Sequence, residues 1–173
     1  MSRLNPLHTD LPVVMLRPGE LHVADKPTLI STILGSCVAV CLYSPRKKVG
    51  AMCHGVMPNS DQKEECARFV DCSINQMVSE LVSRYGVVCS ELEAKVFGGA
   101  TGFDRRNQPG RQLVSIGRQN IESARRCLNE YGVPVLVEKV GGEKGCKMFF
   151  YSHTGEVLMK YLSRQNIVEE NGQ

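Results

Sequence analysis

Short apolar runs separated by polar turns dominate the chain and predict a β-rich fold. The runs at 33–43 and 49–55 are rich in β-branched and aromatic residues, which predicts two strands joined by a hairpin. Further strands are expected at residues 13–16, 21–24, 94–97, 112–116, 135–140, 146–151 and 156–162. Glycine-containing turns separate the last three runs, so we expect them to pair as a meander.

Two segments have the spacing of amphipathic helices. Between residues 64 and 85, apolar side chains recur every three or four positions, and Gly86 is placed to end the helix. A second helix is predicted to begin at Asn120, acting as its N-cap, and to stop at Gly132 and Pro134. Many strands with about two main helices indicate an α+β fold, in which the helices pack on mixed or antiparallel β-sheets.

Length and composition indicate a single domain. The chain has 173 residues, of which 42% are hydrophobic, and this is enough to supply a core. We expect residues 1–12 to form a flexible N-terminal tail, residues 13–163 the domain, and residues 164–173 a polar C-terminal tail. The start does not resemble a signal peptide, and no segment approaches the ~18 apolar residues of a membrane span. These features predict a cytoplasmic protein without direct membrane insertion.

Net charge and cysteine content indicate which partners and which cysteine chemistry to expect. The net charge is +3, and basic residues do not alternate with aromatic ones, so no nucleic acid is expected as a partner. In a reducing compartment the eight cysteines are expected to be thiols, most of them small buried side chains. The polar segment at 101–110 is the loop most suited to contact a partner.

Cys37 and His54 form the strongest candidate for chemistry. If residues 44–47 are the hairpin loop, these two residues lie directly opposite each other, with Cβ atoms roughly 4.5 to 5.5 Å apart. An imidazole near a thiol can activate it as a nucleophile. The bland alternative is a buried strand cysteine beside a structural histidine. A zinc site is disfavoured because the sequence contains no Cys-x2-Cys knuckle.

Small residues around the thiol could complete such a site. Gly35 and Ser36 could leave backbone N–H groups free to bind a developing oxyanion. The third group that fixes the imidazole tautomer would be a hydroxyl, from Ser31 or Thr32, because no carboxylate lies nearby in the sequence. Three more residues are candidates for contacting a substrate: Gly98, Gly99 and Asn120.

Five motifs follow one another along the chain, at residues 34–43, 50–54, 94–100, 116–120 and 141–145. In these motifs the chain resembles the CheD family of chemoreceptor glutamine deamidases. The resemblance implies an amidohydrolase of chemotaxis signal transduction with Cys37 as nucleophile and His54 as base. The family's threonine, six positions before its cysteine, falls on Ser31, with Thr32 next to it. It also implies a three-layered α/β arrangement similar to the catalytic domain of cytotoxic necrotizing factor toxins.

The implied substrates are glutamine side chains on the cytoplasmic helices of methyl-accepting chemotaxis receptors, with weak receptor methylesterase activity as a side reaction. Substrates on long helices predict an open groove around the thiol. No cofactor and no metal are implied. A CheC-type phosphatase is a further implied partner. The alternative reading is a non-catalytic adaptor that binds receptors or this phosphatase and regulates signalling without turnover.

Overall fold

The computed structural model describes residues 9–60, 65–102 and 114–163. Within these ranges the first strand begins at Val13 and the last ends at Tyr161. Residues 1–8 of the expected tail at 1–12, the expected tail at 164–173, and the part of the expected contact loop beyond residue 102 lie outside the described residues.

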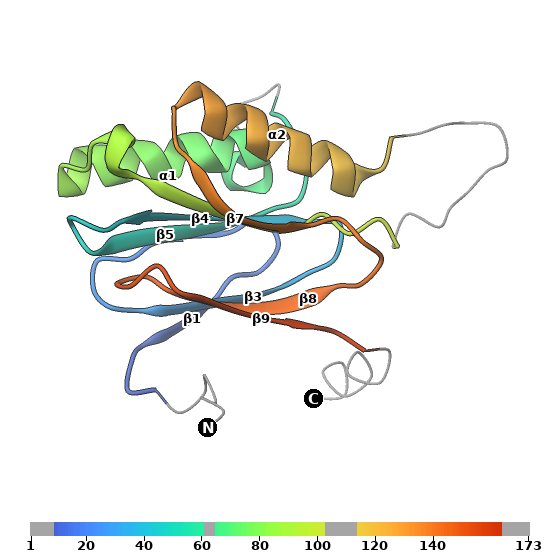
Figure 1. The fold of residues 1–173 in the computed structure, drawn as a ribbon, viewed down its shortest axis with the longest axis horizontal. Coiled ribbons are helices and arrows are strands. Elements are labelled where there is room, and N and C mark those ends of the chain that lie inside the picture. The colour runs from blue at the N-terminus through green and yellow to red at the C-terminus, as the bar shows by residue number, and fades with distance from the viewer. Residues whose placement is uncertain (1–8, 61–64, 103–113, 164–173) are drawn as a thin grey trace, which may run out of the picture.

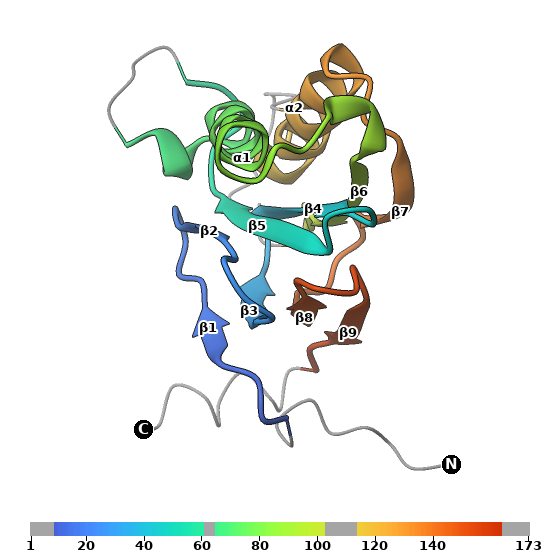
Figure 2. The same cartoon turned by 90° about the vertical axis from the view of Figure 1, so that its left-hand side faces the viewer.

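The chain forms three layers: two helices, a five-stranded sheet and a four-stranded sheet (Figures 1 and 2). Helices α1 (Val70–Tyr85) and α2 (Ile116–Glu130) cover one face of the larger sheet. That sheet has the order β2 (Leu21–Val23), β5 (Val49–Gly55), β4 (Val38–Ser44), β6 (Glu93–Gly98), β7 (Val135–Val140). The smaller sheet has the order β1 (Val13–Met15), β3 (Leu29–Leu34), β8 (Cys146–Tyr151), β9 (Val157–Tyr161). Two short 3-10 helices, η1 (Cys66–Arg68) and η2 (Cys89–Glu91), complete the described elements. The predicted α+β class is confirmed.

The middle sheet is buried on both faces, which explains the unbroken apolar runs of its central strands. Along β4, alternate side chains such as Val40 and Leu42 pack against the helices. The intervening ones, such as Ala39, pack against the smaller sheet in a second apolar layer that includes Phe97 and Phe150. The chain therefore has two cores, and the middle sheet separates them.

Two predictions of strand pairing are wrong. The run at 33–43 is not one strand: β3 ends at Leu34 in the smaller sheet, residues 35–37 cross between layers, and β4 begins in the larger sheet. The predicted meander does not form either, because β7 pairs in parallel with β6, whereas β8 and β9 pair in the other sheet. Gly141 and Gly142, with φ of 77° and 73°, turn the chain from one sheet to the other.

The second helix starts earlier than predicted. Ser115 is its N-cap, and its side chain accepts a hydrogen bond from the Arg118 N–H at 3.1 Å. Of the strand predicted at 112–116, residues 114–116 are thus not a strand, and residues 112 and 113 lie outside the described residues. Asn120 lies within the second turn of α2. The first helix ends at Gly86 as predicted, in a left-handed conformation, but it begins at Val70 after the 3-10 turn η1.

The prediction that the cysteines are thiols is wrong for one pair, because Cys66 and Cys72 form a disulfide. The six other cysteines are free. Four of these are buried, as expected for small apolar side chains: Cys41, Cys53, Cys127 and Cys146. Cys37 and Cys89 are partly exposed. In the described part of the chain, neither helix is long and apolar enough to cross a membrane.

Candidate active site

The hairpin of β4 and β5 places the candidate thiol and imidazole near each other, in a register that differs from the predicted one. Ser44 pairs with Val49, so His54 lies opposite Ala39 rather than Cys37. The shift is two residues, which keeps both candidates on the same face of the sheet. Cys37 directly precedes β4 and is a diagonal neighbour of His54, a relation that separates Cα atoms by roughly 7 to 8 Å.

Cys37 lies on the crossing between the two sheets, and neighbouring elements hold the carbonyl groups of this crossing. Ala100 donates its N–H to the Gly35 carbonyl at 2.9 Å, and Gly99 donates its N–H to the Cys37 carbonyl at 2.8 Å. The carbonyl between them, that of Ser36, accepts a hydrogen bond from the Asn120 side chain at 3.0 Å. Two backbone N–H groups that follow β6 and one side chain of α2 thus hold three consecutive carbonyls.

His54 is buried, with 2% of its surface exposed, and its ring is held by Thr32. Thr32 Oγ1 lies 2.7 Å from His54 Nδ1 and donates its own hydrogen to the Leu16 carbonyl at 2.9 Å. A hydroxyl has one hydrogen, so toward Nδ1 it can act only as an acceptor. The hydrogen bonds therefore assign the proton to Nδ1 and leave the lone pair on Nε2, which has no hydrogen-bond partner among the described residues.

Burial controls the protonation of both groups. It lowers the pKa of His54 to about 4, although the charge of Glu20 and the Leu16 carbonyl partly oppose the shift. Burial also raises the pKa of the Cys37 thiol, and the backbone N–H of Cys37 itself opposes that change. At neutral pH the site therefore holds a neutral imidazole and a neutral thiol, without an ion pair.

The two candidate hydroxyls are not equivalent. Thr32 faces the layer between the sheets, together with Ile30 and Leu34 on the same strand. Ser31 is buried as well, but successive residues of a strand point to opposite faces, so it faces away from His54. Of these two neighbours, only Thr32 is brought to the imidazole.

The three candidates for contacting substrate lie behind the cysteine loop. Gly98 and Gly99 have positive φ, and a Cβ added at Gly98 would overlap the carbonyl oxygen of Cys37. Glycine is required here because backbone approaches backbone closely. Asn120 is fully buried, and both hydrogen bonds of its Nδ2 go to protein carbonyls. These residues support the loop from inside the fold.

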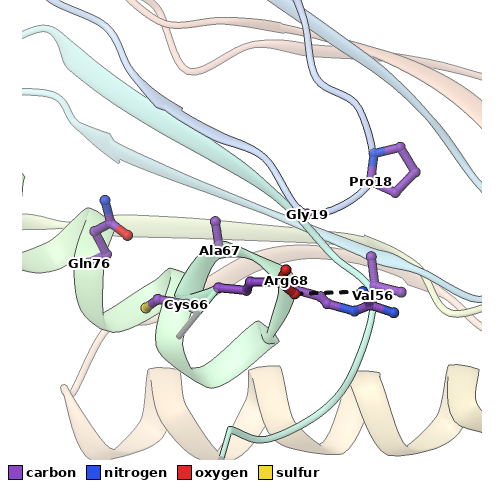
Figure 3. Close-up of a pocket in the computed structure, with 8 residues that line it drawn as sticks. Pro18, Gly19, Val56, Cys66, Ala67, Arg68 and Gln76 are labelled. Atoms are coloured by element: carbon purple, nitrogen blue, oxygen red, sulfur yellow. Dashed lines mark ion pairs between the residues drawn. The ribbon is translucent and has the colours of Figure 1, made fainter. Parts of the chain in front are cut away.

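A cavity of about 650 Å³ lies beside the end of β5 (Figure 3). Continuing the register of β4 and β5 by one residue pairs Cys37 with Val56, which lines this cavity. Arg68 lines another wall and forms an ion pair with Glu65 at 3.7 Å. The complete lining is Pro18, Gly19, Val56, Glu65, Cys66, Ala67, Arg68 and Gln76. Sequence reasoning missed this wall, because the segment was interpreted as the start of an ordinary amphipathic helix.

The cysteines near the thiol do not assemble with it. Cys53 packs in the core under the helices, whereas Cys41 packs in the layer between the sheets. Among the described residues, no group of three His, Cys, Asp or Glu side chains is arranged to hold a metal ion.

Comparison with known proteins gives a consistent result. A family model described as CheD chemotactic sensory transduction matches residues 56–161. A "Probable chemoreceptor glutamine deamidase CheD 2" of Geobacter sulfurreducens is 40% identical over 158 residues, which covers 91% of this chain and 94% of the relative. A "Chemoreceptor glutamine deamidase CheD" of Thermotoga maritima is 35% identical over 144 residues, covering 82% of this chain and 87% of the relative.

Solved structures show likeness of fold alone. The structure of a DUF152 protein from Neisseria meningitidis matches with a TM-score of 0.50 at 12% identity, covering 88% of this chain and 76% of that one.

The family-model match begins two residues after His54, so the thiol and the imidazole precede the matched segment.

Proposed function

Because the chain belongs to the CheD family, we propose that it is an amidohydrolase that converts glutamine side chains of chemoreceptors to glutamates in chemotaxis adaptation. Its curated relatives carry the name chemoreceptor glutamine deamidase. In this proposal Cys37 is the nucleophile, His54 the general base, and Thr32, rather than Ser31, the hydroxyl that orients the imidazole.

The first half of the reaction forms a thioester. The substrate brings Cys37 and His54 into contact, since catalytic hydrogen bonds often close only in the substrate complex. Nε2 takes the thiol proton as sulfur attacks the carboxamide carbon, and backbone N–H groups beside Cys37 bind the oxyanion. The imidazolium then gives its proton to the leaving nitrogen, and ammonia departs.

The second half regenerates the enzyme. Neutral His54 removes a proton from water, the hydroxide adds to the thioester carbon, and the carbon–sulfur bond breaks. The imidazolium returns its proton to sulfur, and the product is glutamate. A low pKa suits the step in which ammonia leaves, because it makes the imidazolium a strong proton donor. No group outside the chain and water is needed to balance the reaction.

The observation that carries this proposal is the hydrogen bond between Thr32 and His54 Nδ1. It leaves a buried, unpartnered Nε2 lone pair on the face of β5 that lies toward the layer between the sheets, and Cys37 packs against the same layer. An unpaired buried polar atom costs about 1 to 3 kcal/mol, and in this proposal Nε2 is left without a partner because it accepts the thiol proton during the reaction.

The cavity beside Val56 provides room for residues that flank the target glutamine. It is open and carries both signs of charge on its wall, from Glu65 and Arg68. A receptor helix can present polar side chains along one face, three or four residues apart, and such a wall can contact them. We propose that this cavity, together with the cysteine loop, forms the groove that receives the receptor.

The test is incubation of chemoreceptor cytoplasmic fragments with the wild-type protein and with Cys37→Ala, followed by peptide mass spectrometry. Wild type should convert specific glutamines to glutamates, and Cys37→Ala should convert none. Cys89→Ala is the matched control, since Cys89 is the other partly exposed free thiol. Retained receptor binding without any conversion by wild type would favour the adaptor alternative and refute the enzyme.

The choice of hydroxyl has its own test. Thr32→Val preserves shape and removes the acceptor for Nδ1–H, and we expect the deamidation rate to fall by at least about tenfold. Ser31→Ala on the neighbouring position should have a much smaller effect. Equal losses in the two variants would contradict the assignment of Thr32.

Two finer features of the sequence analysis remain predictions. One is that the protein is cytoplasmic, on the same side of the membrane as the receptor segments that carry the target glutamines. The other is binding to a CheC-type phosphatase.

A further inference from the structure

Asn120 connects the nucleophile's loop to the strand that carries the base. Its side chain is completely buried in the second turn of α2. Nδ2 donates one hydrogen bond to the Ser36 carbonyl and one to the Val56 carbonyl, both at 3.0 Å. Ser36 precedes Cys37, and Val56 follows His54 by two residues. One amide group therefore spans the two halves of the proposed active site.

The bond to Ser36 fixes the orientation of one particular peptide group. In a trans peptide the C=O of one residue and the N–H of the next point in opposite directions, and the structure contains no cis peptide among its described residues. Because Asn120 holds the Ser36 C=O toward the helix layer, the Cys37 N–H points away from it. The backbone N–H of Cys37 also opposes the rise in the pKa of its own thiol, which agrees with an N–H on the side of the sulfur.

Asn120 is the support of this loop that a single side-chain substitution can remove. The carbonyls on either side, of Gly35 and Cys37, are held by the backbone N–H groups of Ala100 and Gly99. Within the described residues, the Ser36 carbonyl is held by a side chain instead. The middle peptide can therefore be released without altering the hydrogen bonds that hold its neighbours.

We propose that Asn120 is a positioning residue that aims the Cys37 N–H at the oxyanion of the tetrahedral intermediate and fixes the loop relative to the strand of His54. This inference rests on the proposed thiol mechanism. Asn120 itself does not touch the substrate in this arrangement, because its donors are occupied by protein carbonyls and its side chain is buried, including Oδ1, which has no hydrogen-bond partner among the described residues.

The matched control is Ser123, one turn further along the buried face of α2. It is also buried, and its hydroxyl donates to the Pro58 carbonyl on the segment that follows β5. Ser123→Ala thus removes a comparable hydrogen bond between α2 and this segment without touching the Ser36 carbonyl. A purely structural role for Asn120 predicts that substitutions at the two sites act alike.

The experiment measures kcat and KM for receptor deamidation, together with the melting temperature, in Asn120→Leu, Asn120→Ser and Ser123→Ala. The serine variant leaves space for water and disturbs packing less. We expect kcat to fall by about 10- to 100-fold in both Asn120 variants with KM nearly unchanged, within the range found for lost oxyanion donors. Ser123→Ala should lower the melting temperature and leave kcat unchanged.

The outcomes separate this inference from the proposed function. A wild type that deamidates, with a folded Asn120 variant that keeps its full kcat, overturns the inference and leaves the function intact. A wild type that deamidates nothing refutes the function, and Cys37 alkylation then tests the inference. In that case Asn120 variants should shift the pH profile of iodoacetamide labelling upward, and an unchanged profile would overturn it.

A measurement on the wild type needs no variant. Hydrogen exchange followed by NMR should show rapid exchange of the Cys37 N–H and slow exchange of the Asn120 side-chain amide. A Cys37 N–H protected as strongly as the amides of the neighbouring strand β4 would also overturn the inference, because it would then point into the protein.

Discussion

The protonation of His54 predicts a specific dependence of stability on pH. Burial lowers the pKa of His54 to about 4 in the folded protein, from 6.5 for a solvated imidazole. The unfolded chain therefore takes up a proton at this residue before the folded protein does. The stabilising effect is fully present above the unfolded pKa and is lost as pH falls from 6.5 toward about 4.

The magnitude follows from the difference between the two pKa values. One pKa unit corresponds to about 1.4 kcal/mol, so the full effect is about 3 kcal/mol, of which about 2 kcal/mol is lost between pH 7 and pH 5. The assay is urea unfolding at pH 7 and pH 5 of wild type and His54→Asn. Asparagine keeps a donor in the position of Nδ1–H facing Thr32 but does not titrate.

Titration of the other histidines and of the carboxylates is common to both proteins and cancels in the comparison. Wild type should lose about 2 kcal/mol more free energy of unfolding than His54→Asn over this pH interval. Equal losses in the two proteins would refute the reasoning, because His54 would then have the same proton affinity in both states. NMR titration of the ring provides an independent check.

Three further substitutions test features around the site. Gly98→Ala should destabilise the fold by more than about 2 kcal/mol in urea unfolding, because its φ of 97° is unfavourable and its Cβ would overlap the Cys37 carbonyl. Cys66→Ser should cost about 2 kcal/mol under oxidising conditions, by opening the short loop to Cys72, and nothing in excess reductant. Ala67→Trp should fill the cavity and raise KM for receptor fragments about tenfold without changing the rate of Cys37 alkylation.

Each of these has a clear negative outcome. Gly132 also has positive φ, but a Cβ there meets nothing within 4 Å, so Gly132→Ala should cost only about 1 kcal/mol. If Gly98→Ala loses no more free energy of unfolding than Gly132→Ala, the cysteine loop can move to make room for the added Cβ. If the free energies of unfolding of Cys66→Ser and wild type differed by the same amount with and without reductant, the disulfide would be excluded in solution. An unchanged KM in Ala67→Trp would remove the cavity from the receptor-binding surface.

Local sequence pattern predicted elements well and their partners poorly. The bounds of β7 and β8 were predicted correctly because apolar runs and glycine turns delimit them. Their assignment to different sheets could not be predicted, since the turn at Gly141 and Gly142 is compatible with a hairpin or with a crossing between layers. Pairing depends on tertiary packing, which short-range periodicity does not encode.

The site shows the same division. The sequence predicted that Cys37 and His54 share a face, and a register error of two residues did not change that. The choice between Ser31 and Thr32 could not be predicted in this way, because it depends on whether the odd-numbered or the even-numbered residues of β3 face the layer between the sheets. The apolar run that predicts this strand begins at residue 33, whereas β3 spans Leu29–Leu34, so the pattern does not define which of its residues point inward. The role of the Leu16 carbonyl has no sequence signal, since every residue carries that group.

The hydrogen bond between Thr32 and His54 joins residues from different sheets, because β3 belongs to the smaller sheet and β5 to the larger one. Tyr43 and Lys95 of the larger sheet also donate hydrogen bonds to carbonyls of the turn between β8 and β9, and the remaining contacts between the sheets are mainly apolar, around side chains such as Phe97 and Phe150. Apolar contacts tolerate sliding, whereas a hydrogen bond of 2.7 Å is sensitive to displacement. The catalytic rate should therefore depend on how precisely the two sheets are aligned. A repacked Phe150 would slow catalysis by rotating the imidazole well before the protein loses its fold.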